Sequence, residues 1–316
     1  MNELKTMEDF ISSVKTSLAE AFPVCKASVK DITKNNGVCL SGIAIQTQDT
    51  GIAPVIYLEP YFSKLQAGTP LTAVLDEITN NYKAALKDAE TTNTVITNDF
   101  SMAKDRICFQ PVNKELNSRM LSGIPHRELY GLALIYYIKL DSTEESVKTV
   151  KITNSLANLW GADEDQIYRL ACKNTPKLNR GCVIPVSDVM DELMGVPLAK
   201  DTIREKYSYN SFDMTIAKEG GLPIYIATNK NKINGAGVIL YDGLLEAVAD
   251  KIGGFFVLPS SIHECLLVPG AAEKGEDMLQ MVNFVNGTEV PPEDILSGNC
   301  FYYNNNTHKL EIIAHI

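Results

Sequence analysis

The densest group of chemically competent side chains lies in one short stretch, Leu258-Pro259-Ser260-Ser261-Ile262-His263-Glu264. Its residue types allow hydrolysis, with Ser260 or Ser261 as nucleophile, His263 as base and Glu264 as orienting carboxylate. The spacing differs from a nucleophile elbow, because G-x-S-x-G is absent and a serine so close to a histidine in a turn rarely faces its ring. We therefore favour a structural turn, in which the serines bond their own backbone after Pro259, and keep the catalytic interpretation as the alternative.

Metal binding is the second chemistry that these residue types allow. Imidazole, carboxylate and thiolate groups are competent ligands, and His263, Glu264 and Cys265 supply one of each, with His126 available from elsewhere in the chain. Adjacent residues on a strand point to opposite faces, however, so His263 and Glu264 are not expected to share one ion. We therefore expect no metal site and no cofactor.

Three further residues are candidates for binding a partner: His126, Arg127 and Trp160. His126 lies between Pro125 and Arg127, a setting that also fits a loop or a cap. Trp160 serves equally well as a core anchor or as an interface residue. None of the three selects a ligand by itself.

Phosphate and nucleic-acid sites have little support in the sequence. Gly235-Ala236-Gly237 precedes an expected strand instead of a helix, and neither G-x-G-x-x-G nor a Walker motif is present. Two short helices around Trp160-Gly161 form a loose helix-turn-helix, in which Gly161 is expected to cap the end of the first helix and Asp163, with Gln166, the start of the second. A DNA-binding regulator acting through residues 162–175 is our third hypothesis, but Asp163, Glu164 and Asp165 would face the phosphates.

Composition bounds the remaining function classes. The 316 residues carry 29 basic and 39 acidic side chains, giving a net charge of -10 that repels nucleic acid and anionic lipid. Seven scattered cysteines without a C-x-x-C pair fit reduced thiols in a cytosol. The acidic first residues are unlike a signal peptide, and no apolar run reaches membrane-spanning length. We expect a soluble, acidic, cytoplasmic protein.

Residues 223–269 must position the polar turn. Their apolar runs predict, in order, strand, strand, helix, strand and strand, with the turn between the last two. Gly253-Gly254 ends the helix, and the segment before this block is less regular. The expected elements are strands at 223–228, 238–241, 255–258 and 265–268 and a helix at 244–252.

The N-terminal half has its own pattern. Asn35-Asn36-Gly37 between two alternating stretches predicts a tight β-hairpin. Residues 129–140 form an apolar tract that periodicity leaves open as a central strand or a buried helix. Other expected elements are helices at 8–22, 71–86, 187–194 and 278–285, hairpin strands at 25–32 and 38–45, and strands at 53–58, 106–112, 301–303 and 310–313.

These elements predict an α+β protein of two mixed α/β parts with predominantly antiparallel sheets, joined by a short helical segment. The polar run Asp141-Ser142-Thr143-Glu144-Glu145-Ser146 is the best linker candidate. We expect an N-terminal domain at 1–145 that contains the hairpin. The rest, 146–316, would comprise the helical segment, about 150–210, and a C-terminal α/β domain.

Several stretches together carry a family resemblance: 52–58, Lys104-Asp105-Arg106-Ile107, Pro125-His126-Arg127, Trp160-Gly161, Asn174-Thr175-Pro176, the Ser-Ser-Ile-His-Glu turn, and 292–297. The chain resembles domain of unknown function 5688, an uncharacterised family from gut-associated anaerobic bacteria, over nearly its whole length. The resemblance implies a bacterial cytosolic origin and one shared architecture. It supplies no activity, cofactor or site residue.

We therefore expect a non-enzymatic binding or regulatory protein with a protein or small-molecule partner. The runner-up is a hydrolase that uses Ser260 or Ser261 with His263 and Glu264. A concave pocket that holds His263 with a second carboxylate or with His126 would favour the enzyme. A flat apolar patch would favour a partner surface.

Overall fold

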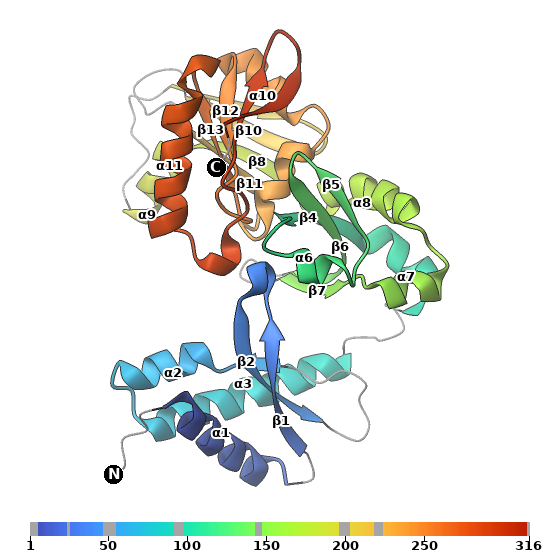
Figure 1. Ribbon diagram of the computed structural model, residues 1–316, viewed down its shortest axis with the longest axis vertical. Coiled ribbons are helices and arrows are strands. Elements are labelled where there is room, and N and C mark those ends of the chain that lie inside the picture. Colours follow the sequence, from blue (N-terminus) through green and yellow to red (C-terminus); the bar gives the residue numbers. More distant parts are fainter. Residues whose placement is uncertain are drawn as a thin grey trace. The chain divides into compact units, whose positions relative to one another are not determined.

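The computed structural model describes residues 6–23, 26–46, 55–91, 98–142, 147–195, 203–217 and 224–314 (Figure 1). The chain forms two compact units, an N-terminal unit, Met1–Ile96, and a C-terminal unit, Thr97–Ile316. Both combine helices with mainly antiparallel sheets, so the α+β prediction is confirmed.

This division differs from the boundary that we expected within residues 141–146. Asp141 and Ser142 belong to strand β6 (Leu132–Ser142), which pairs with β7 (Val147–Lys151) in one antiparallel sheet. The rest of the expected linker, 143–146, lies outside the described residues. Two strands that share a hydrogen-bonded ladder belong to the same domain, so the polar run connects neighbouring strands instead of separating domains.

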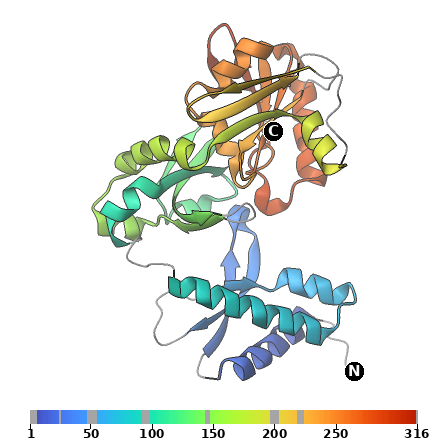
Figure 2. The ribbon, with the colours of Figure 1, turned by 180° about the vertical axis from the view of Figure 1, so that it is seen from behind.

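The N-terminal unit is a three-stranded sheet with helices on one face (Figure 2). The predicted hairpin is confirmed, and Asn36 and Gly37 in its turn have φ of 59° and 72°. Of the predicted strand starts, Cys25 and residues 53 and 54 lie outside the described residues. The elements are α1 (Met7–Ala21), β1 (Lys26–Thr33), β2 (Cys39–Gln46), β3 (Val55–Tyr57), α2 (Glu59–Gln66) and α3 (Leu71–Thr91).

Helical spacing builds the core of this unit. Phe10, Val14 and Leu18 recur at intervals of four on α1 and are fully or almost fully buried. They pack with Ile43 of the sheet. The partners on α3, at the same spacing, are Val74, Ile78 and Tyr82.

The C-terminal unit begins with a four-stranded antiparallel sheet, drawn in green in Figure 1. The tract at 129–140 is extended and not helical: Leu129 ends β5, Tyr130 and Gly131 form a turn, and from Leu132 on the tract belongs to β6. Strand β6 pairs with β4 on one side and with β5 and β7 on the other. Besides β6 and β7, the elements are α5 (Phe100–Ala103), β4 (Ile107–Asn113), α6 (Ser118–Leu121), β5 (His126–Leu129), α7 (Asn154–Trp160) and α8 (Glu164–Leu178).

The caps predicted around α7 and α8 are confirmed. Gly161 ends α7 in the left-handed region with φ of 64°. Asp163 begins α8, and its carboxylate accepts a hydrogen bond from the Gln166 backbone N–H at 2.7 Å.

An eight-stranded sheet completes the unit in the order β15-β14-β12-β13-β11-β8-β10-β9, and only β8 and β10 pair in parallel. The sequence pattern did not reveal β8, β9 and β10, and Pro223 lies outside the described residues. The strands are β8 (Gly181–Pro185), β9 (Arg204–Ser208), β10 (Phe212–Ala217), β11 (Tyr225–Asn229), β12 (Phe255–Leu258), β13 (Cys265–Pro269), β14 (Cys300–Asn304) and β15 (Lys309–Ala314).

Helices cover both faces of this sheet. Along β12, Phe255 and Val257 join the core that contains α10, whereas Phe256 and Leu258 join the cluster that contains Val282 of α11. Alternate strand residues point to opposite faces, so α10 and α11 lie on opposite sides, and Figure 1 shows α11 alongside the sheet. The helices are α9 (Val186–Leu193), α10 (Leu244–Ile252) and α11 (Gly275–Thr288).

The strand predicted at 238–241 is wrong. These residues fall mainly in a buried 3-10 helix, Gly235–Leu240, which enters from Asn234 in the left-handed region at φ 52°. A short, fully buried apolar run does not distinguish helix from strand by its periodicity. Here the backbone N–H groups of Gly235 and Ala236 donate to the carbonyls of His263 and Ile262, and these contacts fix the start of the helix.

Candidate functional site

The Ser260–Glu264 turn is fastened to a distant segment by its backbone. The Ile262 N–H donates to the Asp294 carbonyl at 2.8 Å, and the Leu296 N–H donates to the Ser260 carbonyl at 3.0 Å. Ser261 and Ile295 form an isolated antiparallel bridge between these bonds. Both serines are at most 7% exposed. The turn therefore pairs with residues 294–296 as a short additional strand of the C-terminal unit would.

The His263 ring has partners on both nitrogens, and neither is a serine. Its Nδ1 accepts a hydrogen bond from the Asn234 backbone N–H at 3.1 Å, and its Nε2 lies 3.4 Å from Oδ1 of Asp294. The Ser261 hydroxyl instead accepts from the His263 backbone N–H at 3.0 Å. This is the local serine turn of our structural interpretation. A nucleophile and base in hydrogen-bonding contact, which hydrolysis requires, is not formed by these residues.

The carbonyl of His263 also anchors the buried 3-10 helix. It accepts hydrogen bonds from the Gly235 backbone N–H at 3.0 Å and from the Thr228 hydroxyl at 2.7 Å. A Cβ at Gly235 would lie only 2.2 Å from the Thr228 hydroxyl oxygen and 2.7 Å from the His263 carbonyl oxygen. Only glycine allows this close approach, so the turn and the helix depend on each other.

Glu264 is the titratable group that this arrangement perturbs. Burial raises the pKa of its carboxyl, and the nearby Asp294 carboxylate raises it further. The His263 imidazole and a hydrogen bond from Ser261 act in the opposite direction. Ionised Glu264 therefore lowers the stability of the folded state, because its charge is held partly out of water.

Arg127 joins β5 to the first turn of α8. Its guanidinium donates to both carboxylate oxygens of Glu164, at 3.2 and 2.6 Å, and to Asp165. It also stacks on the Tyr168 ring at 3.9 Å, and Tyr136 donates to the same Glu164. Hydrogen bonding to Glu164 is the main cause that raises the pKa of Arg127. The carboxylates that argued against DNA binding are therefore engaged within the protein.

His126 and Trp160 lie apart from the serine turn. His126 on β5 places Nδ1 3.1 Å from the Ile124 carbonyl, and no hydrogen bond or ion pair of the described residues joins it to His263. Trp160, half-buried at the end of α7, packs against Phe100 with ring centroids 5.4 Å apart. The structure therefore does not bring the predicted candidates together into one site.

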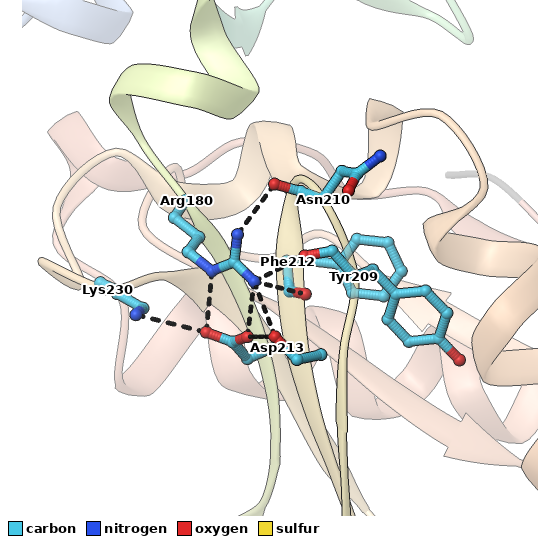
Figure 3. A network of polar contacts seen from close by, with 7 residues as sticks. Arg180, Tyr209, Asn210, Phe212, Asp213 and Lys230 are labelled. Atoms are coloured by element: carbon cyan, nitrogen blue, oxygen red, sulfur yellow. Dashed lines mark hydrogen bonds and ion pairs between the residues drawn. The ribbon is translucent and has the colours of Figure 1, made fainter.

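A dense polar network surrounds Arg180, which the sequence did not single out (Figure 3). The guanidinium donates to both oxygens of Asp213, at 2.9 and 2.6 Å, and to backbone carbonyls that include those of Tyr209 and Asn210. This hydrogen bonding holds the pKa of Asp213 well below its usual range. Because all three guanidinium nitrogens donate hydrogen bonds within the protein, we interpret the network as a clasp between β8 and the β9–β10 turn.

The C-terminal unit also contains a cleft of about 620 Å³ that is rich in tyrosines, which we call the aromatic cleft. It combines aromatic rings with exposed charged side chains, a composition typical of small-molecule sites. No local motif marks it, because its residues come from five separate segments. The lining includes Phe109, Tyr130, Tyr168, Cys172, Tyr241, Asp242, Leu245, Glu246, Tyr303, His308, Lys309 and Leu310.

Tyr130 enters the aromatic cleft from an unusual backbone conformation. It and Gly131 form the two-residue turn between β5 and β6, with φ of 53° and 73°. Two positive φ values are those of a type I′ turn, where asparagine and glycine are preferred. A bulky residue there is strained, yet Tyr130 is 40% exposed. The strained residue is thus also one of the exposed large hydrophobic residues of this unit.

The charged lining of the aromatic cleft includes two carboxylates. Asp242 and Glu246 flank the start of α10, and Nδ1 of His308 lies 3.9 Å from Oε1 of Glu246. The pKa of Tyr303 is raised by burial first and then by the charge of Glu246 and of Asp250. The cleft thus offers aromatic faces beside negative charge, with Lys309 as a neighbouring cation.

None of the described helices is both long and apolar enough to cross a membrane. Across the described ranges, His, Cys, Asp and Glu side chains do not gather in a group of three that could hold a metal ion. A family model described as a family of unknown function (DUF5688) matches residues 7–305. Neither the curated proteins nor the solved structures contain a match.

Proposed function

The chain belongs to this family of unknown function, and we propose that it is a non-enzymatic binding protein whose ligand occupies the aromatic cleft. The family description names no activity, so the proposal depends on the residues. Tyr130 carries it. An exposed aromatic side chain is held at the edge of a cleft by a strained turn that asparagine would form with less strain. Strain of this kind concentrates at ligand sites.

Charge and shape favour a flat, cationic ligand. Tyrosine faces attract cations that lie over the ring. Asp242 and Glu246 add negative charge at the same cleft. A ligand with a planar body and an amidinium or ammonium group would satisfy both features.

The hydrolase alternative gains no supporting observation. Both nitrogens of the His263 ring face groups other than a hydroxyl, and Ser261 is used as a local acceptor. The DNA-binding hypothesis is likewise weakened, because Glu164 and Asp165 at the start of α8 bind Arg127.

We also propose a bacterial protein that works in the cytoplasm. The family resemblance supports the bacterial origin. All six described cysteines are free thiols, which fits a reducing compartment. Fractionation of a bacterium that encodes the chain would test this, and recovery in the periplasm or the medium would contradict it.

Benzamidine tests the cleft directly, because it combines a flat ring with a cation. We expect it to perturb backbone amide NMR signals around the aromatic cleft at millimolar concentration, and benzoate, with the opposite charge, to bind more weakly. Glu246→Gln should weaken benzamidine binding severalfold. Glu192→Gln is the matched control, because Glu192 is also exposed, at 71% against 60% for Glu246, and lies on α9 away from the aromatic cleft. Absence of any shift at the cleft, or equal binding of benzoate, would overturn the proposal.

A further inference from the structure

A second concave surface adjoins the aromatic cleft and has a different chemistry. It measures about 980 Å³, and we call it the amide groove. Its lining contains no aromatic ring and no cation, and a single carboxylate, Glu115. The other lining residues are Asn113, Leu116, Gly131, Asn283, Asn286, Gly287, Ile295, Ser297, Gly298, Asn299 and Ile312.

The two surfaces meet at one turn and one strand. Tyr130 lines the aromatic cleft, and the next residue, Gly131, lines the amide groove. Lys309 and Leu310 at the start of β15 line the cleft, whereas Ile312 on the same strand lines the groove. An extended molecule could therefore pass from one surface to the other across the Tyr130–Gly131 turn.

The turn lies next to two residues of the groove. A Cβ at Gly131 would lie 3.4 Å from Nδ2 of Asn299 and 3.7 Å from Cδ1 of Ile312, at ordinary van der Waals distance. Gly131 therefore faces the groove while its neighbour Tyr130 lines the cleft. A ligand that lies over this turn would contact both surfaces together.

The groove is suited to groups that both donate and accept hydrogen bonds. Asparagine amides do both. Asn286 donates from Nδ2 to the Ser297 carbonyl at 2.9 Å, but its buried Oδ1 accepts no hydrogen bond from the described residues. Because this oxygen is buried, the amides that a ligand can reach are the more exposed ones of the groove, such as that of Asn283.

Apolar side chains border the amides. Leu116 is 50% exposed and Ile312 is 41% exposed. Alternating amides and apolar contacts match a peptide, whose backbone groups need hydrogen bonds while its side chains bury apolar area. A glycan would instead require aromatic rings for stacking, and the groove has none.

We propose that the ligand is an extended peptide with a basic side chain. The lysine or arginine lies in the aromatic cleft against Asp242 and Glu246, and the following peptide groups lie in the amide groove. This inference rests on the proposed function of the aromatic cleft. It adds that one ligand spans both surfaces and that the groove contributes affinity through its asparagine amides.

Three probes test the proposal: the short N-acetyl-lysine amide and two hexapeptides of opposite direction, acetyl-Lys-(Ala)₅-amide and acetyl-(Ala)₅-Lys-amide. The hexapeptides extend to about 20 Å, at about 3.4 Å per residue. We expect one of them to bind about tenfold tighter than the lysine amide by calorimetry or NMR titration, because a few added hydrogen bonds supply that much.

Two substitutions separate the surfaces. Asn283→Ala should weaken hexapeptide binding severalfold and leave the affinity for the lysine amide unchanged. The reason is that Asn283 is exposed on α11 and lines the groove but not the cleft. Glu246→Gln should weaken all three probes. Leu116→Ser is a second groove variant on a different element, should Asn283→Ala alter the fold.

The failures are distinguishable. If benzamidine and the lysine amide bind at the cleft but the hexapeptides bind no tighter, the peptide inference is overturned and the proposed function stands. If none of these molecules binds, both fail. Tighter binding of neutral maltohexaose, with the same loss in Asn283→Ala, would overturn the peptide class.

Discussion

The Ser260–Glu264 turn and the aromatic cleft use their polar side chains in opposite ways. In the turn, the His263 ring and the Ser261 hydroxyl are engaged with nearby backbone and with Asp294. In the cleft, Tyr130 and Glu246 are exposed. The polar side chains of the turn have partners within the protein, whereas those of the cleft remain available to a ligand.

The comparison teaches that crowding of reactive residue types along a chain is weak evidence for a site. Adjacent polar residues reach neighbouring backbone groups first, and buried polar atoms must be satisfied. A stronger signal is a local conformation that the residue does not favour. Tyr130 at positive φ is such a case, whereas asparagine and histidine, as at Asn234 and His308, tolerate that region better.

The largest expected effect is on stability at His263. His263→Ala removes the acceptor for the Asn234 N–H and the partner of Asp294, so the free energy of unfolding should fall by about 2 kcal/mol. His263→Asn keeps an acceptor near the Nδ1 position and should lose less than half as much. Urea denaturation measures both, and a change in His263→Ala within about 0.5 kcal/mol would contradict the structural role.

An effect of opposite sign is expected at Tyr130. Tyr130→Asn produces the Asn-Gly sequence that type I′ turns prefer and should raise the free energy of unfolding by about 1 kcal/mol. The same variant should weaken benzamidine binding, because the ring at the cleft is lost. Tyr209→Asn is the control, since Tyr209 stacks on Phe212 away from the cleft and its loss should not affect binding. If Tyr130→Asn bound benzamidine with unchanged affinity, Tyr130 and its strained turn would have no role in ligand binding.

The smallest effect concerns pH. The pKa of Glu264 is raised above its ordinary value of 4.5, so the folded state holds this proton more tightly than the unfolded state. Stability from this group therefore falls as pH rises from about 4.5 through the folded pKa. Glu264→Gln should remove that decline and be more stable than the parent at neutral pH. Parallel stability profiles of the two proteins in this range would refute the assignment.

Asp213 gives the contrasting pH behaviour within the same unit. Its pKa is lowered, mainly by hydrogen bonds from Arg180, so its contribution is present above its unfolded value of 3.8 and is lost as pH falls toward the folded pKa. The pH range in which this stability is lost lies below the range in which Glu264 changes stability. The two carboxyls can therefore be separated by the pH at which stability changes.

Much of the fold could be predicted from local chemistry. Asn35-Asn36-Gly37 indicated the first hairpin, and Gly161 and Asp163 indicated the ends of α7 and α8. The 3-10 helix at Gly235–Leu240 was not predicted, because its form depends on contacts with Thr228 and His263. The strands β9 and β10 were not predicted either, since Arg180 links their turn to β8 from 29 and 30 residues away.

The sequence by itself determined the α+β class, the caps and the hairpin, because these depend on backbone preferences and on periodicities within a few residues. It also indicated that the serine turn is structural. Only the tertiary structure decided where a ligand site can lie. Tyr130, Glu246 and His308 come together at one cleft through the packing of the two sheets of the C-terminal unit, and such long-range packing leaves no local pattern in the chain.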